Sequence, residues 1–164
     1  MIQLLTMPFL LNEAGDRFRP ASEAGREVDL AMVASFDSMR RSWTFGEVAR
    51  ATLADLQTLA EECSQTGWDG YGATPIGPET LNAAERLVKS LPFDLPKPEA
   101  SASPVGDIAL EWAQTPRRIV SVAISGNGQI HFASLNGQNR EFGSMPFDGT
   151  FSPRLAELIR NVLG

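Results

Sequence analysis

The stretch DIALEWAQTPRRIVSVAISGNGQIHFA, residues Asp107–Ala133, decides the fold because its apolar side chains recur at every second residue. Alternation of this kind is typical of a half-buried β-strand. It occurs in three runs, at residues 108–113, 120–124 and 130–133. The Gly126-Asn127-Gly128 turn joins the second run to the third, and Asn136-Gly137 joins the third to a short strand around Arg140–Phe142. The sequence therefore predicts an antiparallel meander of three to four strands.

Helical patterns lie on both sides of this meander. Apolar spacings of three and four predict helices over Pro20–Trp43, Phe45–Gln65 and Pro78–Leu91, and another after Ser152-Pro153. Four prolines between Pro92 and Pro104 indicate an extended connector that is not a core element. We therefore expect a two-layer α+β fold, in which helices from the N-terminal half and a C-terminal helix pack on one face of the sheet.

A chain of 164 residues is the length of one domain. Residues 45–164 form the expected α+β core, and residues 1–44 hold an apolar segment and a helix that join the domain or form an appendage. The segment Met1–Leu11 lacks the positive charge and the cleavage site of a secretory signal, and it is too short to span a membrane. These features predict a cytoplasmic protein.

The charge balance argues against a nucleic-acid partner. Twenty acidic and 14 basic residues give a net charge of −6, whereas a general nucleic-acid binder needs a basic face. The single cysteine, Cys63, and the single histidine, His131, are too few for a cysteine-rich or histidine-rich metal site. We expect no metal and no cofactor.

Two sets of residues are candidates for catalysis, and no known catalytic motif supports either set. Cys63, His131 and Asp69 are the types found in a nucleophilic triad, but Cys63 falls on the apolar face of its helix, where a buried thiol is inert. Asp69 and Glu111 form a possible carboxylate pair, although Asp69 more simply accepts N–H groups of its own turn. We therefore expect no enzymatic activity.

The most specific motif is the loop Trp68-Asp69-Gly70-Tyr71-Gly72-Ala73-Thr74-Pro75. Its glycines permit tight turns, but their spacing and the lack of a preceding strand do not match a phosphate cradle. Trp and Tyr concentrate binding energy at protein interfaces. The loop either fills the gap between helix and sheet, with Trp68 inside, or presents Tyr71 as a recognition residue, and both can hold. We also expect Trp68 and Trp112 to lie close together at the edge of the core.

From Leu53 to the C-terminal end, the chain resembles a family of small bacterial proteins. The shared motifs are W-D-G-Y-G-A-x-P-I, here Trp68–Ile76, and G-x-I-x-L-E-W, here Gly106–Trp112. Gly67 departs from the family, which often has Asn there. The resemblance implies a fold and brings no catalytic residue with it.

These observations favour a non-enzymatic protein-binding module of a bacterial or phage chain, with an inhibitory role of the antitoxin or anti-defence kind. The expected partner is another protein or a second copy of this chain, with no nucleic acid and no membrane. The alternative is a small enzyme or ligand-binding domain with a pocket near Trp68, Asp69, Tyr71, Glu111 and Trp112. The candidate partner-binding residues share an aromatic, methionine or arginine character or belong to the loop: Tyr71, Asp69, Met32, Phe36, Met39, Arg40, Arg41, Arg117 and Arg118.

Overall fold

The computed structural model describes the backbone of residues 23–164 and the side chains of residues 32–35 and 46–164. Contacts between Cα atoms divide the chain into two units, Met1–Arg40 and Arg41–Gly164, and each unit is described by itself. None of the described helices is both long and apolar enough to cross a membrane.

Helix α1 (Glu23–Glu62) runs without a break through the region where two helices were predicted. The predicted boundary near Trp43 was wrong because the sequence there holds no proline, and the interior Gly46 weakens a helix by only about 1 kcal/mol. In the first unit, the described side chains Met32 and Val33 are exposed. The side chains of the partner-binding candidates Phe36, Met39, Arg40 and Arg41 lie outside the described residues.

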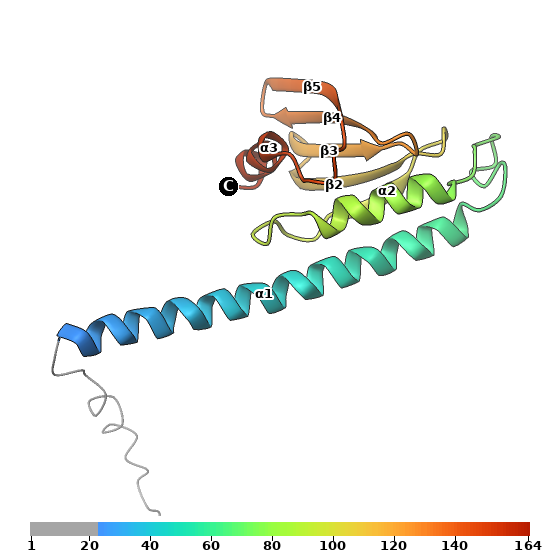
Figure 1. Cartoon of the computed structure of the whole chain (residues 1–164). Coiled ribbons are helices and arrows are strands. Elements are labelled where there is room, and N and C mark those ends of the chain that lie inside the picture. The colour runs from blue at the N-terminus through green and yellow to red at the C-terminus, as the bar shows by residue number, and fades with distance from the viewer. Residues whose placement is uncertain (1–22) are drawn as a thin grey trace, which may run out of the picture. The chain divides into compact units, whose positions relative to one another are not determined.

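The second unit contains one antiparallel sheet of five strands in the order β1-β2-β3-β4-β5, which confirms the predicted α+β meander (Figure 1). The strands are β1 (Glu99–Ala102), β2 (Ile108–Thr115), β3 (Arg118–Ile124), β4 (Gln129–Asn136) and β5 (Asn139–Pro146). The predicted number of three to four strands was too low, because β1 lies inside the proline-rich connector. Its four residues include no proline, so they can pair with β2, and Pro98 and Pro104 lie outside the strand.

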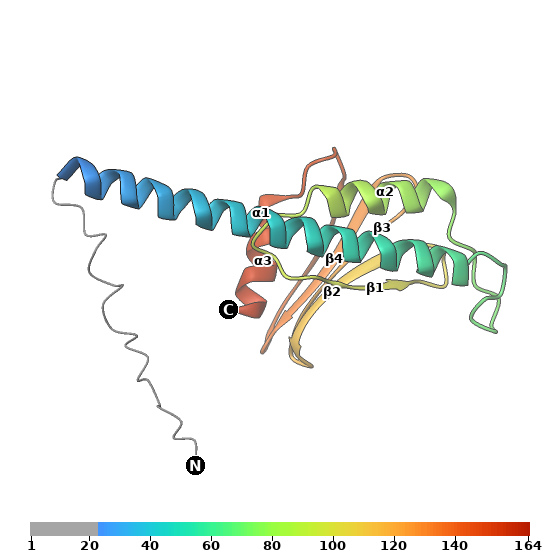
Figure 2. The same cartoon turned by 90° about the horizontal axis from the view of Figure 1, so that it is seen from below.

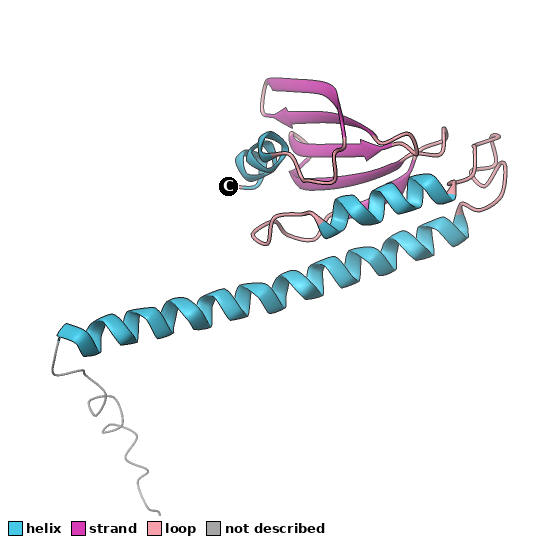
Figure 3. Cartoon of the chain, viewed as in Figure 1, coloured by secondary structure: helices cyan, strands magenta, loops and turns pink. Residues whose placement is uncertain are grey.

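The two faces of the sheet differ in what covers them. One face is buried, with side chains that include Leu110, Trp112 and Val122. It packs on the end of α1 and on the helices α2 (Pro78–Lys89) and α3 (Pro153–Leu163), as expected for helices on one face (Figures 2 and 3). The strand residues that alternate with these buried ones belong to the other face and are partly or fully exposed; examples are Glu111, Ser121 and Ala133.

Helix α3 is fixed to the sheet at its C-terminal end by side chains from three strands. Gln114 donates to the carbonyl of Leu163 at 2.9 Å, and Arg118 and Asn136 both donate to the carbonyl of Asn161 at 3.1 Å. The last carbonyl groups of a helix have no partner within it, and a positive charge near them is favourable. The three side chains therefore cap α3 and set its position on β2, β3 and β4.

Candidate functional site

The loop that follows α1 is closed by hydrogen bonds within itself. The N–H of Gly67 donates to the carbonyl of Ala73 at 2.8 Å, and the indole N–H of Trp68 donates to the carbonyl of Thr74 at 3.1 Å. Three glycines of the loop, Gly67, Gly70 and Gly72, have positive φ, which side chains of other residues rarely adopt. The glycines predicted for tight turns therefore serve the backbone path of the loop.

Asp69 holds the centre of this loop. Its Oδ1 atom accepts the backbone N–H groups of Tyr71 at 2.8 Å and Ala73 at 3.0 Å. These two bonds, the one from Tyr71 first, lower the pKa of the Asp69 carboxyl below its ordinary value because they favour the charged form. The structure thus gives Asp69 the local turn role, one of the two roles the sequence offered.

A second loop, between β1 and β2, braces the first. The N–H of Thr74 donates to the carbonyl of Pro104 at 2.8 Å. Gly106 has a φ of +87°, and a Cβ atom there would lie 3.0 Å from the carbonyl oxygen of Pro75. The two family-like motifs therefore meet: the glycine that begins the second motif makes room for the end of the first.

Tyr71 projects from this braced loop with 96% of its surface exposed. Val105, at the tip of the neighbouring loop, is 71% exposed. Trp68, in contrast, is half-buried. Trp68 is thus more covered than Tyr71, as was expected, and a recognition role for Tyr71 stays a prediction. We call Tyr71, Val105 and the loop Trp68–Pro75 the aromatic tip.

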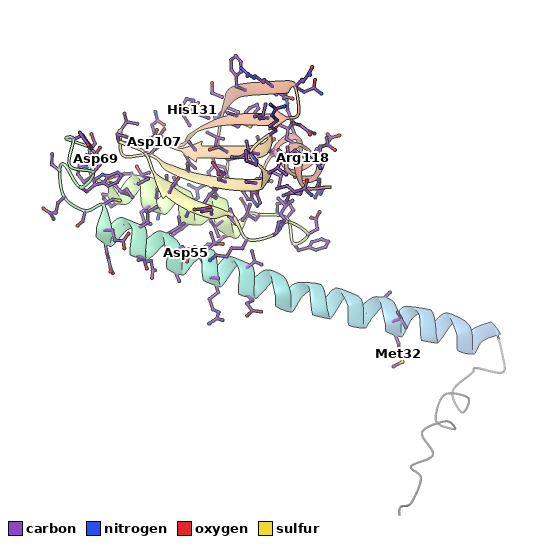
Figure 4. The ribbon with its side chains drawn as sticks, turned by 180° about the vertical axis from the view of Figure 1, so that it is seen from behind. Met32, Asp55, Asp69, Asp107, Arg118 and His131 are labelled. Carbon is purple, nitrogen blue, oxygen red and sulfur yellow. The ribbon has the colours of Figure 1, made fainter. Side chains whose placement is uncertain are left out.

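The aromatic tip lies in an acidic part of the domain. Between Ala51 and Glu85 the chain has no Lys or Arg, and its acidic residues are Asp55, Glu61, Glu62, Asp69, Glu79 and Glu85. Figure 4 shows Asp69 and Asp107 toward one end of the domain and Arg118 toward the other. The net charge of −6 does not reveal this separation, but the spacing of Lys and Arg along the chain could have revealed it.

Arg117 and Arg118, two of the four arginines predicted as partner contacts, lie at the other end of the domain and differ from each other. Arg118 caps α3, as described above. Arg117 is exposed in the turn between β2 and β3, where its carbonyl accepts the N–H of Gly137 from the next turn. Arg117 therefore remains available as a surface residue, whereas Arg118 already has a structural partner.

The residues of the hypothetical triad are not brought together. Cys63 is buried in the helical layer, and burial together with the charge of Glu62 raises the pKa of its thiol. His131 is exposed on the sheet face that turns away from the helices. Asp69 is engaged by its own loop. A thiolate is the reactive form of cysteine, so a buried thiol with a raised pKa is a poor nucleophile.

The alternative pocket does not form from its five predicted residues. Trp112 is only 2% exposed; its indole N–H donates to the carbonyl of Pro96 at 2.9 Å, and its ring packs edge-on against Phe151. Glu111, the preceding residue in β2, points to the opposite face of the sheet. Trp68 bonds to Thr74, which in turn bonds to Pro104 ahead of β2, whereas Trp112 lies well along β2. The expectation that the two tryptophans lie close together was therefore wrong.

A polar hollow lies elsewhere, between the start of α2 and the turn that joins β3 to β4. It has a volume of about 560 Å³, and its lining includes Glu79, Asn82, Arg86 and Asn127. Arg86 lies over the ring of Phe147 at 5.5 Å. Among the residues that the structure describes, no three His, Cys, Asp or Glu side chains gather as metal ligands would.

Comparison with known proteins adds one partial similarity. No family model and no solved structure matches the chain. Over 87 residues, 53% of this chain, it is 30% identical to "Aldehyde oxidase 4" of Arabidopsis thaliana. The chain covers only 6% of the length of that protein, so this similarity does not show a family. The resemblance to small bacterial proteins stays a prediction.

Proposed function

We propose that this chain is a non-enzymatic protein-binding module and that the aromatic tip is its recognition site. The observation that carries the proposal is Tyr71, a large side chain that is 96% exposed on a loop fixed by hydrogen bonds. Exposing an aromatic ring in this way gives the free protein no packing energy. A fixed loop loses little conformational entropy on binding, so the contact of the ring with a partner is retained as affinity.

The chemistry of the tip favours a basic partner surface with an apolar pocket. Tyr71 and Val105 would supply the buried contacts, and Glu61, Glu62 and Asp107 would supply charge around them. Opposite charges at the rim of an interface raise the association rate and exclude partners of the wrong sign. An inhibitory module of the antitoxin or anti-defence kind, which covers a basic surface of its target, would have this character.

Affinity capture with the full chain tests the proposal. Wild type, Tyr71→Ala and Phe93→Ala are used as baits for an extract of the cells in which the protein naturally occurs. Phe93 is the matched control, since it is also an exposed phenyl side chain, 55% exposed, outside the tip. We expect Tyr71→Ala to lose the proteins that wild type and Phe93→Ala retain. If all three baits capture the same proteins in the same amounts, the aromatic tip is not the recognition site.

A further inference from the structure

The sheet face that turns away from the helices has the composition of an interface. At its centre, Ser121 and Ala133 are directly paired across β3 and β4, and Ile119 and Leu135 are paired beside them. Together with Phe142 on β5 they line a hollow of about 290 Å³. We call this surface the open face.

Phe142 is the most exposed part of the open face. It lies opposite Ala133 in the pairing of β4 with β5, and 83% of its surface is exposed. A phenyl ring that stands beside a hollow of small and apolar side chains is typical of a surface that another molecule covers. The ring and the hollow lie on the same face of one molecule. This face therefore offers both an apolar side chain that can be buried and an apolar space that can receive one.

We propose that two copies of this chain pack their open faces together about a two-fold axis parallel to the strands, between β3 and β4. The axis places β3 over β4 of the second copy, and β2 over its β5. The rotation does not change the position of a residue along the strand direction, so residues that are paired across β3 and β4 come face to face. Ile119 then contacts Leu135 of the second copy, and Ser121 contacts its Ala133. Sheets that pack face to face keep their strands roughly aligned and about 10 Å apart, and small side chains at the centre permit this approach.

The same operation gives Phe142 a place in the second copy. Phe142 is level with Glu111 across the sheet, because Phe142 pairs with Ala133, Ala133 pairs with Ser121, and Ser121 pairs with Glu111. It therefore comes to lie over β2 of the second copy, where Ala109 and Ala113 flank Glu111 and leave room for a ring. Two-fold symmetry repeats this contact, so both exposed rings are covered.

Charge complementarity is what favours a second copy as the occupant. Arg140 lies on β5, in the row of Leu135, Ile119 and Ala113. Across the interface Arg140 therefore lies over Ala113 of the second copy, two residues along β2 from its Glu111. This separation is about 7 Å, which an arginine side chain can span. Arginine pairs well with carboxylates, and the symmetry forms this pair twice.

The size of the face sets the expected strength. With strands about 4.8 Å apart and residues about 3.4 Å apart, the face measures roughly 450 Å² per copy. Standard stable interfaces bury about 800 Å² per partner, so the dimer should be weak, with a dissociation constant in the micromolar range. The proposal is independent of the proposed function, because the open face and the aromatic tip are made by different residues.

Sedimentation velocity on the full chain, from about 1 μM to about 1 mM, tests the proposal. The variants are Phe142→Glu, Arg140→Glu, Glu111→Arg and the double charge exchange Arg140→Glu/Glu111→Arg. Phe93→Glu is the control for adding a carboxylate at an exposed phenyl side chain, and circular dichroism verifies the fold of each variant. We expect wild type and Phe93→Glu to dimerise as the concentration rises and Phe142→Glu to stay monomeric.

The charge variants separate this arrangement from other dimers. Each single reversal should raise the dissociation constant about tenfold, and the double exchange should recover most of the loss, because the pair is restored with its signs exchanged. A wild-type chain that is monomeric at every concentration overturns the proposal. A dimer that Phe142→Glu leaves intact also overturns it. The same holds if the double exchange raises the dissociation constant by as much as the two single reversals combined, since the charge pair would then not be restored.

Discussion

Asp69 is the residue on which the aromatic tip depends, because its carboxylate accepts two backbone N–H groups of the loop. Its pKa is lowered in the folded chain, so the charged carboxylate stabilises the fold above the unfolded pKa of about 4, and this contribution is lost as the pH falls through the folded pKa. We expect Asp69→Asn, which keeps an acceptor oxygen without the charge, to be less stable than wild type at neutral pH, and we expect this difference to become smaller at an acidic pH well below about 4.

Urea unfolding of the two proteins at both pH values measures this difference directly. Other groups that titrate, such as Asp94 with its pKa lowered by the hydrogen bond from Arg160, contribute equally to both proteins and cancel in the comparison. A difference in unfolding free energy that is the same at both pH values would contradict the role of the charge.

Trp112 is the residue that joins the sheet to the segment before it and to the segment that leads into α3. It is buried, packs against Phe151 and donates to Pro96. Trp112→Ala should lower the unfolding free energy by about 3–5 kcal/mol, since it leaves a cavity and an unpaired carbonyl. Trp112→Phe should cost less, because it keeps most of the ring volume. Denaturant unfolding followed by circular dichroism checks both, and a loss under 1 kcal/mol for the alanine variant would refute the assignment.

At the scale of elements, α3 depends on side chains from the sheet for its last turn. Removing one of them, in Arg118→Ala, should weaken the fold by about 1 kcal/mol and speed the hydrogen exchange of the α3 amide groups more than that of the β3 and β4 amide groups. Arg117→Ala, one residue away and without this contact, is the control. Equal exchange in the two variants would mean that Arg118 does not hold α3.

The strands were predictable because their side chains alternate between a covered face and an open one, as Ile108, Leu110 and Trp112 do with Ala109 and Glu111. The short β1 was not predictable in this way: its residues Glu99-Ala-Ser-Ala102 have weak strand propensity, and only pairing with β2 makes them a strand. The continuity of α1 was also missed, because the apolar pattern was divided near Trp43, where the sequence holds no proline to end a helix.

The candidate site was predictable only in its local part. The sequence indicated that Asp69 could bond within its own turn and that Tyr71 was a candidate for recognition. It did not indicate that Gly106 would brace this loop, because that contact joins residues about 30 positions apart through the fold. The open face likewise becomes visible only when register brings Ile119, Leu135 and Phe142 together.

At the scale of the whole molecule, the second unit contains the complete sheet, α2, α3 and the core that joins them. A chain that begins at Arg41 keeps all of these elements and the last turns of α1. We therefore expect it to unfold in one cooperative transition, with the near-ultraviolet circular dichroism of a packed core. Calorimetry checks this, and a broad transition, or a chain that expresses unfolded, would show that residues 1–40 are needed for the fold.

The affinity of the captured partner for Tyr71 variants tests the central claim most directly. Titration calorimetry would compare wild type, Tyr71→Phe and Tyr71→Ala, with Phe93→Ala as the control. We predict that Tyr71→Ala raises the dissociation constant by at least about thirtyfold, equivalent to about 2 kcal/mol, that Tyr71→Phe raises it less, and that Phe93→Ala leaves it unchanged. A dissociation constant that Tyr71→Ala leaves within a factor of about two of wild type would contradict a recognition role for the aromatic tip.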